Sequence, residues 1–398
     1  TKRRAPRQYR LSTIASANQS TLSFVKLSSK PGRCSTTLHQ TCCGRLFERV
    51  MVPVRPLEIV LLTDGVPGHY HRGEAVAQAI QRLRETTVVR VPVSVRTPLR
   101  GWMLSWLLSK AVSPETVLKL AYKEKVEPSR PDLIVSAGGN TMAANVALAR
   151  LTGAPNIFFG SLRRFDPRDF TLVLNCYSFD TPHANQVRIL KPTPADPTTL
   201  PSADLDHRRL PRVAGLLVGG PSGEARFDRR DWSRLETLLS ETRLRLGVEW
   251  IVSNSRRTPA SVSDMLANLA AERSGPVKRF IDVRTSGPGT LRELFAESGA
   301  VAITADSSAM LSEAVWMRRP AISLRPKSMK LTDKEREYRQ WLERRNLCRE
   351  LSLADVSPDA FASALREIEP LAGNPLADLA ATLAERVPFL FREEPAVT

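Results

Sequence analysis

The sequence lacks the marks of several protein classes. It has five cysteines in 398 residues, and only Cys176 and Cys348 lie beyond residue 50, far apart, so neither a disulfide framework nor a paired-cysteine metal site is indicated. A reducing compartment is therefore expected. No apolar run reaches the roughly 18 residues that a spanning helix needs. The spacings HxxxH, HExxH and GxSxG are missing too, which argues against metal-dependent and serine hydrolases and predicts no metal.

Acidic side chains are in the minority. The chain has 58 Lys and Arg against 41 Asp and Glu, a net charge of +17, but ten of the basic residues and a single acid, Glu48, lie in residues 1–50. The remainder is only mildly basic, so nucleic acid is not indicated as a partner. The length and the 42% of apolar residues predict two to three domains with sizeable cores.

Residues 1–50 differ in composition from the rest. Thirteen of the fifty are Ser or Thr and acid is almost absent, which is typical of an organellar transit peptide. Met51 then opens a segment that looks like the start of a domain. Three interpretations stay open: an extension outside the folded protein, a targeting segment, or a basic tail. We expect this segment to be disordered and leave it out of the fold.

From residue 57 onward, short apolar runs alternate with stretches of helical spacing, such as 74–84 and 141–151, as in βαβ units. The strands expected in the first half are 57–63, 88–93, 132–136, 156–159 and 171–175. Those expected in the second half are 213–218, 249–252, 279–283, 300–304 and 321–324. Residues 191–211 hold five prolines and predict a linker. Helices are expected at 333–345, 358–368 and 375–386.

The predicted fold is α/β, with two Rossmann-like parallel-sheet domains facing a cleft. We expect an N-terminal domain at 51–205, a C-terminal domain at 206–335 and C-terminal helices at 336–398. Ligands of such sheets bind beyond the carboxyl ends of the strands, so the cleft between the domains is the expected site.

Two candidate loops lie in the first half, each after a strand and before a helix. The loop TDGVPGH contains Asp64, Gly65 and Gly68, and His69 at its tip could act as a general base. The loop SAGGNT contains Gly138, Gly139 and Asn140, and the side chain of Asn140 or Thr141 is expected to cap the helix. A tight turn without function is the alternative for each.

The second half has three more loops. VGGPSG, with Gly220, Ser222 and Gly223, could cradle a phosphate, although it is neither a Walker A loop nor GxGxxG. The next loop carries Arg256 and Arg257, which could hold phosphate or face solvent.

The loop TADSSAMLSEA carries the most information. Ser307 or Ser308 could cap the following helix and touch a diphosphate, and Glu313 could accept hydrogen bonds from ribose hydroxyls. Asp306 would repel a diphosphate there, or serve as the N-cap. A capped helix with a surface Glu remains the alternative.

These motifs carry a resemblance. TDGVPGH, SAGGNTMAANVALARLTGAPN, VGGPSG, SNSRRTP and TADSSAMLSEAVWMRRPAISL, in this order, resemble the plant "elongated mitochondria" fission-protein family and its bacterial glycosyltransferase-like relatives over about residues 57–325. The chain also looks like the wider GT-B glycosyltransferases. By that resemblance Gly65, Gly68 and His69 belong to the acceptor side. Gly220, Ser222, Ser307, Ser308 and Glu313 belong to the nucleotide-sugar side.

The resemblance implies a metal-independent GT-B glycosyltransferase. It would move a sugar from a nucleoside diphosphate sugar to a glycan or lipid-linked acceptor, with His69 as base. The nucleotide sugar is the expected small-molecule partner, as a substrate, and no cofactor is expected. Two alternatives stay open. One is a non-catalytic fission-type protein that recruits a dynamin-like GTPase. The other is a nucleoside-diphosphate-sugar epimerase, which needs the same donor loops but no acceptor site.

The segment 101–112, GWMLSWLLSKAV, is too short to span a membrane. Its two tryptophans suit an amphipathic helix in an anionic membrane interface, and a helix packed in the core is the alternative. A cytoplasmic protein that can bind peripherally to a membrane is expected, with mitochondrial association as the alternative.

Overall fold

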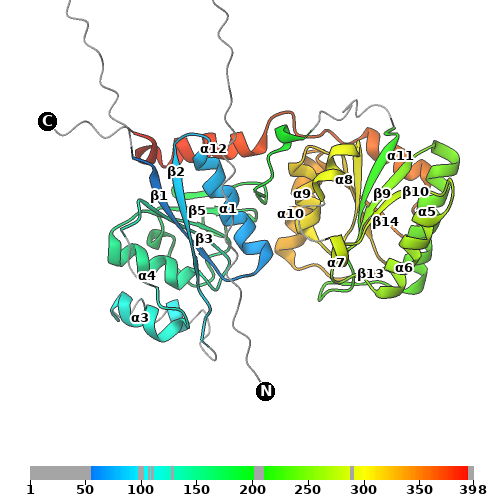
Figure 1. Cartoon of the computed structure of the whole chain (residues 1–398). Helices are drawn as coiled ribbons and strands as arrows, with labels where there is room; N and C mark the ends of the chain where they lie inside the picture. The colour runs from blue at the N-terminus through cyan, green and yellow to red at the C-terminus, as the bar shows by residue number, and fades with distance from the viewer. Residues whose placement is uncertain are drawn as a thin grey trace, which may run out of the picture. The chain divides into compact units, whose positions relative to one another are not determined.

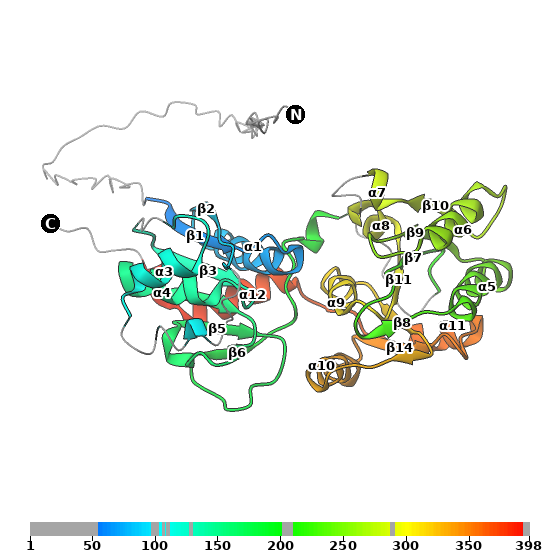
Figure 2. The ribbon, with the colours of Figure 1, turned by 90° about the horizontal axis from the view of Figure 1, so that it is seen from below.

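Two parallel sheets organise the part of the chain that the structure describes. The computed structural model describes residues 55–96, 103–105, 108, 112–126, 130–200, 210–286 and 291–392. The chain divides into two units, 1–52 and 53–398, and all that follows belongs to the second. Figures 1 and 2 show the strands and the helices around them. The prediction of an α/β fold with two parallel-sheet domains is confirmed.

The first sheet has the strand order β2-β1-β3-β4-β5-β6, and every neighbouring pair is parallel. Its strands are β1 (Leu57–Thr63), β2 (Thr86–Pro92), β3 (Leu133–Ala137), β4 (Asn156–Phe159), β5 (Leu172–Asn175) and β6 (Gln186–Arg188). The strand order changes direction between β1 and β3, which makes that position a topological switch point. We call this sheet with its helices the first lobe.

The second sheet, with its helices the second lobe, has the order β10-β9-β7-β11-β12-β14 and is parallel throughout. Its strands are β7 (Val213–Leu217), β9 (Glu249–Ser253), β10 (Val277–Ile281), β11 (Ala300–Thr304), β12 (Ala321–Arg325) and β14 (Cys348–Ser352). This is the 3-2-1-4-5-6 order of dinucleotide-binding folds, and its switch point lies between β7 and β11. The short strands β8 (Ala225–Arg226) and β13 (Ser328–Met329) form a separate antiparallel pair.

Side chains alternate along β1 and divide the first lobe into two packed layers. Ile59 and Leu61 lie in a cluster with α1 (Pro67–Gln81), whereas Val60 and Leu62 lie in a cluster with α3 (Pro114–Ala121) and α4 (Met142–Thr152). Because successive strand residues point to opposite faces, helices cover the sheet on both sides. This double burial explains why the strand is a continuous apolar run.

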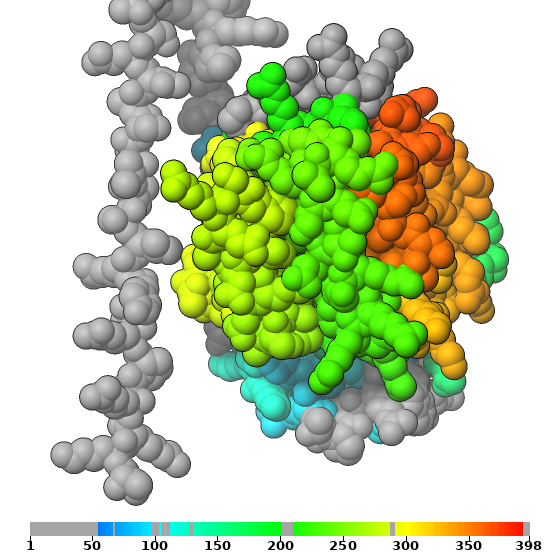
Figure 3. All heavy atoms as spheres, turned by 90° about the vertical axis from the view of Figure 1, so that its right-hand side faces the viewer, coloured from blue at the N-terminus to red at the C-terminus, as the bar shows by residue number. Residues whose placement is uncertain are grey.

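The second lobe is layered in the same way. Trp250 and Val252 of β9 lie with α5 (Arg229–Leu246), α6 (Ala260–Ala271) and α11 (Pro358–Arg366), the layer seen from outside in Figure 3. Ile251 lies in the cluster that includes α8 (Leu291–Glu297), α9 (Ser308–Trp316) and α10 (Asp333–Arg344). The four-residue helix α7 (Val283–Ser286) follows β10.

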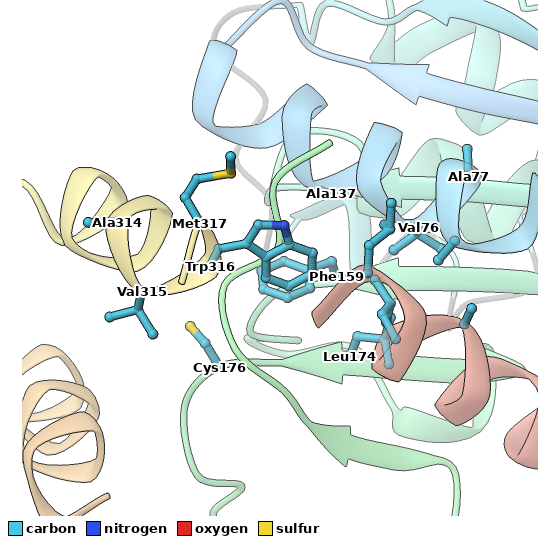
Figure 4. Close-up of a cluster of buried hydrophobic side chains, with 14 of the residues drawn as sticks. Val76, Ala77, Ala137, Phe159, Leu174, Cys176, Ala314, Val315, Trp316 and Met317 are labelled. Atoms are coloured by element: carbon cyan, nitrogen blue, oxygen red, sulfur yellow. The ribbon is translucent and has the colours of Figure 1, made fainter. Parts of the chain in front are cut away.

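The last long helix, α12 (Pro375–Arg386), packs against α1 of the first lobe (Figure 1). Beyond it, Arg84 donates a hydrogen bond to the carbonyl oxygen of Leu390 at 2.8 Å. Residues of α1 and α12 lie in one buried apolar cluster with Phe159 and Trp316 (Figure 4). The Trp316 indole N–H donates to the carbonyl oxygen of Ala195 at 2.8 Å. The C-terminal helix thus supports the helix that carries His69.

Most predicted elements match the structure closely. The strands at 57–63, 156–159 and 300–304 and the helix at 375–386 have the predicted bounds, and the other predicted strands differ by one or two residues. The helix expected at 74–84 begins earlier, at Pro67. The strands β6 and β14 were not predicted.

Some predictions fall wholly or partly outside the described residues. Residues 1–50 and 201–209 lie outside them, as do Trp102 and Trp106 of the segment 101–112. Two described side chains of that segment, Leu104 and Leu108, are buried in the first-lobe core. Its membrane-interface role stays a prediction. Among the described residues, no helix has both the length and the apolar character to cross a bilayer.

Candidate functional site

The four glycine- and serine-rich loops predicted from the sequence all lie at switch points. The loops after β1 and β3 flank the switch point of the first lobe, and those after β7 and β11 flank that of the second. In open α/β sheets, adjacent loops diverge at this position and leave room for a ligand. The topology therefore selects the same loops as the sequence.

A buried carboxylate organises the first-lobe switch point. Asp64 follows β1, and its side chain is 2% exposed. It accepts hydrogen bonds from Nδ1 of His69 at 2.8 Å, from the amide of Asn140 at 3.0 Å and from the backbone N–H of Val66 at 3.2 Å. Because a carboxylate only accepts, Nδ1 of His69 donates the proton of this hydrogen bond, and in the corresponding tautomer Nε2 keeps its lone pair.

The prediction that His69 lies at a loop tip is wrong, because His69 lies in the first turn of α1. The helix begins at Pro67, whose ring suits the first helical position. The His69 side chain is 30% exposed, and among the described residues its Nε2 has no hydrogen-bond partner. Gly68 has open space beside its Cα, so no neighbour requires a glycine there.

Two adjacent glycines make room for side chains at this point. Gly138 has a φ of +88°, and a Cβ there would overlap the imidazole of His69. A Cβ on Gly139 would lie 2.7 Å from the guanidinium carbon of Arg163. Gly65, with a φ of +75°, is needed for the backbone conformation itself. The pair of glycines thus allows the side chains of His69 and Arg163 to approach the loop closely.

The prediction that Asn140 or Thr141 caps α4 through its side chain is wrong. Thr141 occupies the N-cap position, but its hydroxyl donates to backbone carbonyl groups of the loop, and Asn140 donates to Asp64. The N–H of Ala144 donates instead to the hydroxyl of Tyr122, at 3.0 Å. The amide of Asn140 is therefore available to position Asp64.

A second buried carboxylate organises the second-lobe switch point. The Asp306 side chain is fully buried. It accepts hydrogen bonds from the Thr304 hydroxyl at 2.7 Å, from the N–H of Gly220 at 3.2 Å and from Arg257 at 2.6 Å. Gly219 donates to the Thr304 hydroxyl at 2.6 Å, and a Cβ on Gly219 would overlap the carboxylate. The glycines of this loop thus admit Asp306.

Asp306 is neither the N-cap of α9 nor exposed to repel a ligand, so both predicted roles are wrong. Ser307 is the N-cap, and its hydroxyl accepts from the N–H of Met310 at 3.3 Å. Burial raises the pKa of Asp306, against the hydrogen bond from Thr304. The carboxylate accepts hydrogen bonds from the glycine loop and from Arg257, whose side chain is partly exposed.

The other residues predicted in these two loops are less closely engaged. The Ser222 hydroxyl accepts from the N–H groups of Glu224 and Ala225, at 3.2 and 3.0 Å, so it stabilises its own turn. Gly223 has nothing within 4 Å of the position of a Cβ. Arg256 is exposed. These positions do not join the Asp306 network.

Lys191 reaches the N-terminal end of α9 from the segment between the lobes. Its ammonium donates to the Ser308 hydroxyl at 2.6 Å and pairs with Glu335 at 3.1 Å, and it lies 4.2 Å from the ring centre of Tyr338. The Lys191 and Glu335 side chains are 4% and 8% exposed. Burial raises the pKa of Glu335, but Lys191, Ser308 and Tyr177 outweigh it and hold that pKa below its usual value. Sequence reasoning assigned Lys191 only to the linker.

Glu313 is the unpaired carboxylate of this region. It lies in the second turn of α9, partly buried, and among the described residues its side chain has no hydrogen bond or ion pair. Burial raises its pKa to about 7. A buried carboxyl group without a partner can accept hydrogen bonds from a ligand, and such bonds would stabilise its ionised form.

The structure thus assembles two groups of residues. One holds Asp64, His69 and Asn140. The other holds the N-terminal end of α9, which Lys191 contacts from the segment between the lobes, and Glu313 in the second turn of the same helix. Among the residues the structure describes, no group of three or more His, Cys, Asp or Glu is placed to hold a metal ion.

Several solved structures are similar to this chain. MurG from Acinetobacter baumannii has 14% sequence identity over 82% of this chain and 100% of its own, with a TM-score of 0.47. The glycosyltransferase SnogD from Streptomyces nogalater has 13% identity over 84% of this chain and 96% of its own, with a TM-score of 0.47. The UDP-GlcNAc 2-epimerase from Methanocaldococcus jannaschii has 12% identity over 84% of this chain and 100% of its own, with a TM-score of 0.49.

Sequence comparison gives a further result. The family model described as mitochondrial fission ELM1 matches residues 67–388, which include all four switch-point loops except Asp64, Gly65 and Val66. No curated protein matches the chain significantly.

Proposed function

This chain belongs to the mitochondrial fission ELM1 family, and we propose that it is a glycosyltransferase that takes a sugar from a nucleoside diphosphate sugar. The second lobe would bind the donor and the first lobe the acceptor. The observation that carries the proposal is the contact between buried Asp64 and Nδ1 of His69, at 2.8 Å, which leaves Nε2 available as a base.

The proposed reaction uses this geometry. Nε2 of His69 accepts the proton of an acceptor hydroxyl as the oxygen bonds to the anomeric carbon of the sugar. The bond from that carbon to the diphosphate oxygen breaks, and its electron pair leaves with the diphosphate. Asp64 stabilises the imidazolium that forms and fixes the tautomer, as a carboxylate does beside a catalytic histidine.

The donor site supplies charge and hydrogen bonds. The N–H groups at the start of α9, with the helix dipole, favour a diphosphate beside Ser307 and Ser308, and the Lys191 ammonium is held at the same helix end by Ser308. These groups would take up the charge of the leaving diphosphate without a metal ion. The unpaired carboxylate of Glu313 matches the two hydroxyls of a ribose.

Calorimetric titration of the full chain with a panel of nucleoside diphosphate sugars tests the proposal. We expect heat of binding for at least one of them, and no heat for any, from a folded protein, would refute it. Product analysis of the bound donor incubated alone and with candidate acceptors separates transfer from epimerisation. A donor that changes its sugar stereochemistry without an acceptor would establish the epimerase instead.

Glu313 makes donor affinity depend on pH. Its pKa of about 7 means that the carboxylate that accepts from ribose is mostly protonated one unit below and mostly ionised one unit above. We expect the affinity for a nucleotide sugar to rise about tenfold between about pH 6 and about pH 8. Glu313→Gln should bind more weakly at the upper pH and lose this slope. The nucleotide sugar has no group of its own that titrates there.

The same group sets a stability trend of opposite sign. The pKa of Glu313 is raised above its ordinary 4.5, so the folded chain retains a proton in that window that the unfolded chain has lost. The free energy of unfolding without ligand should therefore fall as pH rises from about 4.5 through 7. Chemical unfolding at several pH values should show Glu313→Gln to be flatter than the native chain. An identical pH profile in both would contradict the assignment.

Family membership favours a second candidate, a scaffold that recruits a dynamin-like GTPase to a membrane. Such a role needs a docking surface and not the His69 base. Capture of a purified dynamin-like GTPase by the native chain, and equally by His69→Gln, would support it. Absence of nucleotide-sugar binding together with capture would replace the proposed enzyme by the scaffold.

A further inference from the structure

Arg163 lies at the first-lobe switch point but belongs to neither group described above. It follows β4, which is the neighbour of β3 in the sheet, so its loop emerges at the same edge as those of Asp64 and Gly138. Its guanidinium lies against Gly139, where a Cβ would come within 2.7 to 3.0 Å of three guanidinium atoms. The adjacent residue Gly138 receives the imidazole of His69 in the same way.

The backbone of Arg163 is held in an unfavourable conformation. Its φ is +56°, in the left-handed region that residues other than glycine rarely adopt. Conformations of this kind persist where the surrounding structure imposes them, and they gather at binding sites. The conformation here accompanies the placement of the guanidinium on the glycine loop.

Arg163 differs from the paired arginines around it. Among the residues the structure describes, no carboxylate or carbonyl group accepts a hydrogen bond from it, and the residue is exposed. The arginines nearby are paired: Arg150 with Asp169 at 2.7 Å and Arg168 with Asp166 at 2.7 Å. Five guanidinium donors therefore point to solvent or to a ligand beside the imidazole.

The loop beneath it offers further donors. The backbone N–H groups of Gly139 and Asn140 have no acceptor among the described residues. A guanidinium with neighbouring amide donors matches a tetrahedral oxyanion, whose several oxygens each accept hydrogen bonds. Buried Asp64 does not compete, because its carboxylate is already bonded by His69, Asn140 and Val66.

We infer that Arg163 and the Gly139–Asn140 loop form a subsite for a phosphate group of the acceptor, next to the hydroxyl that His69 deprotonates. The inference rests on the proposed function and names the chemistry of its acceptor: a phosphate-bearing molecule rather than a neutral glycan. The phosphate belongs either to a soluble sugar phosphate or to a lipid headgroup. Arg163 binds and positions it, and takes no part in proton transfer.

Nuclear magnetic resonance of the His69 ring tests the subsite in the full chain. The sequence has five histidines, so His69 can be assigned by comparison with His69→Gln. Titration with methyl phosphate at constant pH should shift its resonance saturably. We expect Arg163→Gln to weaken this affinity at least about fivefold and Arg163→Lys to weaken it less. Arg168→Gln, which removes the same charge from the same loop, should leave it unchanged.

Three further arms separate the alternatives. Acetate should bind more weakly than methyl phosphate, and equal affinity would overturn the choice of phosphate. Glucose 1-phosphate and vesicles with or without phosphatidic acid distinguish a soluble from a lipid-borne group. Arg163→Gly should raise the denaturant midpoint, because glycine adopts a positive φ without strain, while phosphate affinity falls. Replacing an arginine with a purely structural role would not raise the denaturant midpoint and lower the phosphate affinity together.

The outcomes can be told apart from those of the proposed function. No saturable shift of the His69 resonance, or the same affinity in Arg163→Gln as in the native chain, overturns the phosphate subsite even if nucleotide sugars bind the second lobe. A phosphate response that depends on Arg163, in a chain that binds no nucleotide sugar, upholds the subsite and refutes the glycosyltransferase.

Discussion

Replacing His69 with Gln should lower the rate of sugar transfer by about three orders of magnitude while the affinity for the nucleotide sugar changes little. Loss of a general base costs roughly 10²- to 10⁴-fold. His69 lies in the first lobe, whereas the residues assigned to the donor lie in the second lobe or, for Lys191, in the segment between the lobes. Single-turnover rates with donor and acceptor, together with calorimetry on the donor, measure the two effects separately.

Asp64→Asn extends the test. An amide in place of the carboxylate can donate to Nδ1 and favour the wrong tautomer, so we expect a loss of comparable size, about 10²-fold or more. His71→Gln is a matched control, because His71 lies two residues on and is exposed. A folded His69→Gln chain that transfers sugar at the native rate would eliminate His69 as the base.

Lys191→Met should reduce the free energy of unfolding by about 2–3 kcal/mol, less than the roughly 3–5 kcal/mol for a buried charge left without any partner, because Arg339 still faces Glu335. Glu335 would then keep the hydrogen bond from the Tyr177 hydroxyl and the guanidinium of Arg339 at 3.6 Å, but it would lose the ammonium. Denaturant unfolding of the native and variant chains measures the change.

A double variant shows whether the pair itself carries the effect. Lys191→Met with Glu335→Gln removes both charges, and we expect it to recover only part of the lost stability, because Arg339 then loses its own partner in Glu335. Arg168→Met, which breaks an exposed pair with Asp166, should leave the free energy of unfolding almost unchanged. If Lys191→Met were as mild as this control, Lys191 would not be a structural ion-pair partner.

The sequence predicts the strands well where burial on both faces leaves a single pattern. Residues 57–63 and 300–304 are short apolar runs that end in Thr, and each is flanked by a turn or helix signal. β14 was missed because its sequence CRELS places charged residues in a partly buried edge strand. β6 was missed because three half-buried residues carry no period. Edge strands lack the double burial that marks the central ones.

The candidate site is predictable in part. Glycines between a strand and a helix identify the loops, because few other positions need them. The partners depend on contacts distant in sequence: Asp64 with Asn140, Asp306 with Arg257, and Lys191 with Glu335. No local pattern specifies these pairs. Asp306 could be placed beside the helix end but not oriented, since the overlap with Gly219 that decides its direction arises only in the folded sheet.

The return of α12 to the first lobe makes the C-terminal end of the chain essential to a residue encoded some three hundred codons earlier. A stop codon just before residue 375 would leave both sheets intact in sequence yet remove the helix that packs on α1, whose first turn holds His69. Shortened gene products should therefore keep the donor loops while their imidazole loses its support. Frameshifts near the 3′ end would be as damaging as lesions at the site itself.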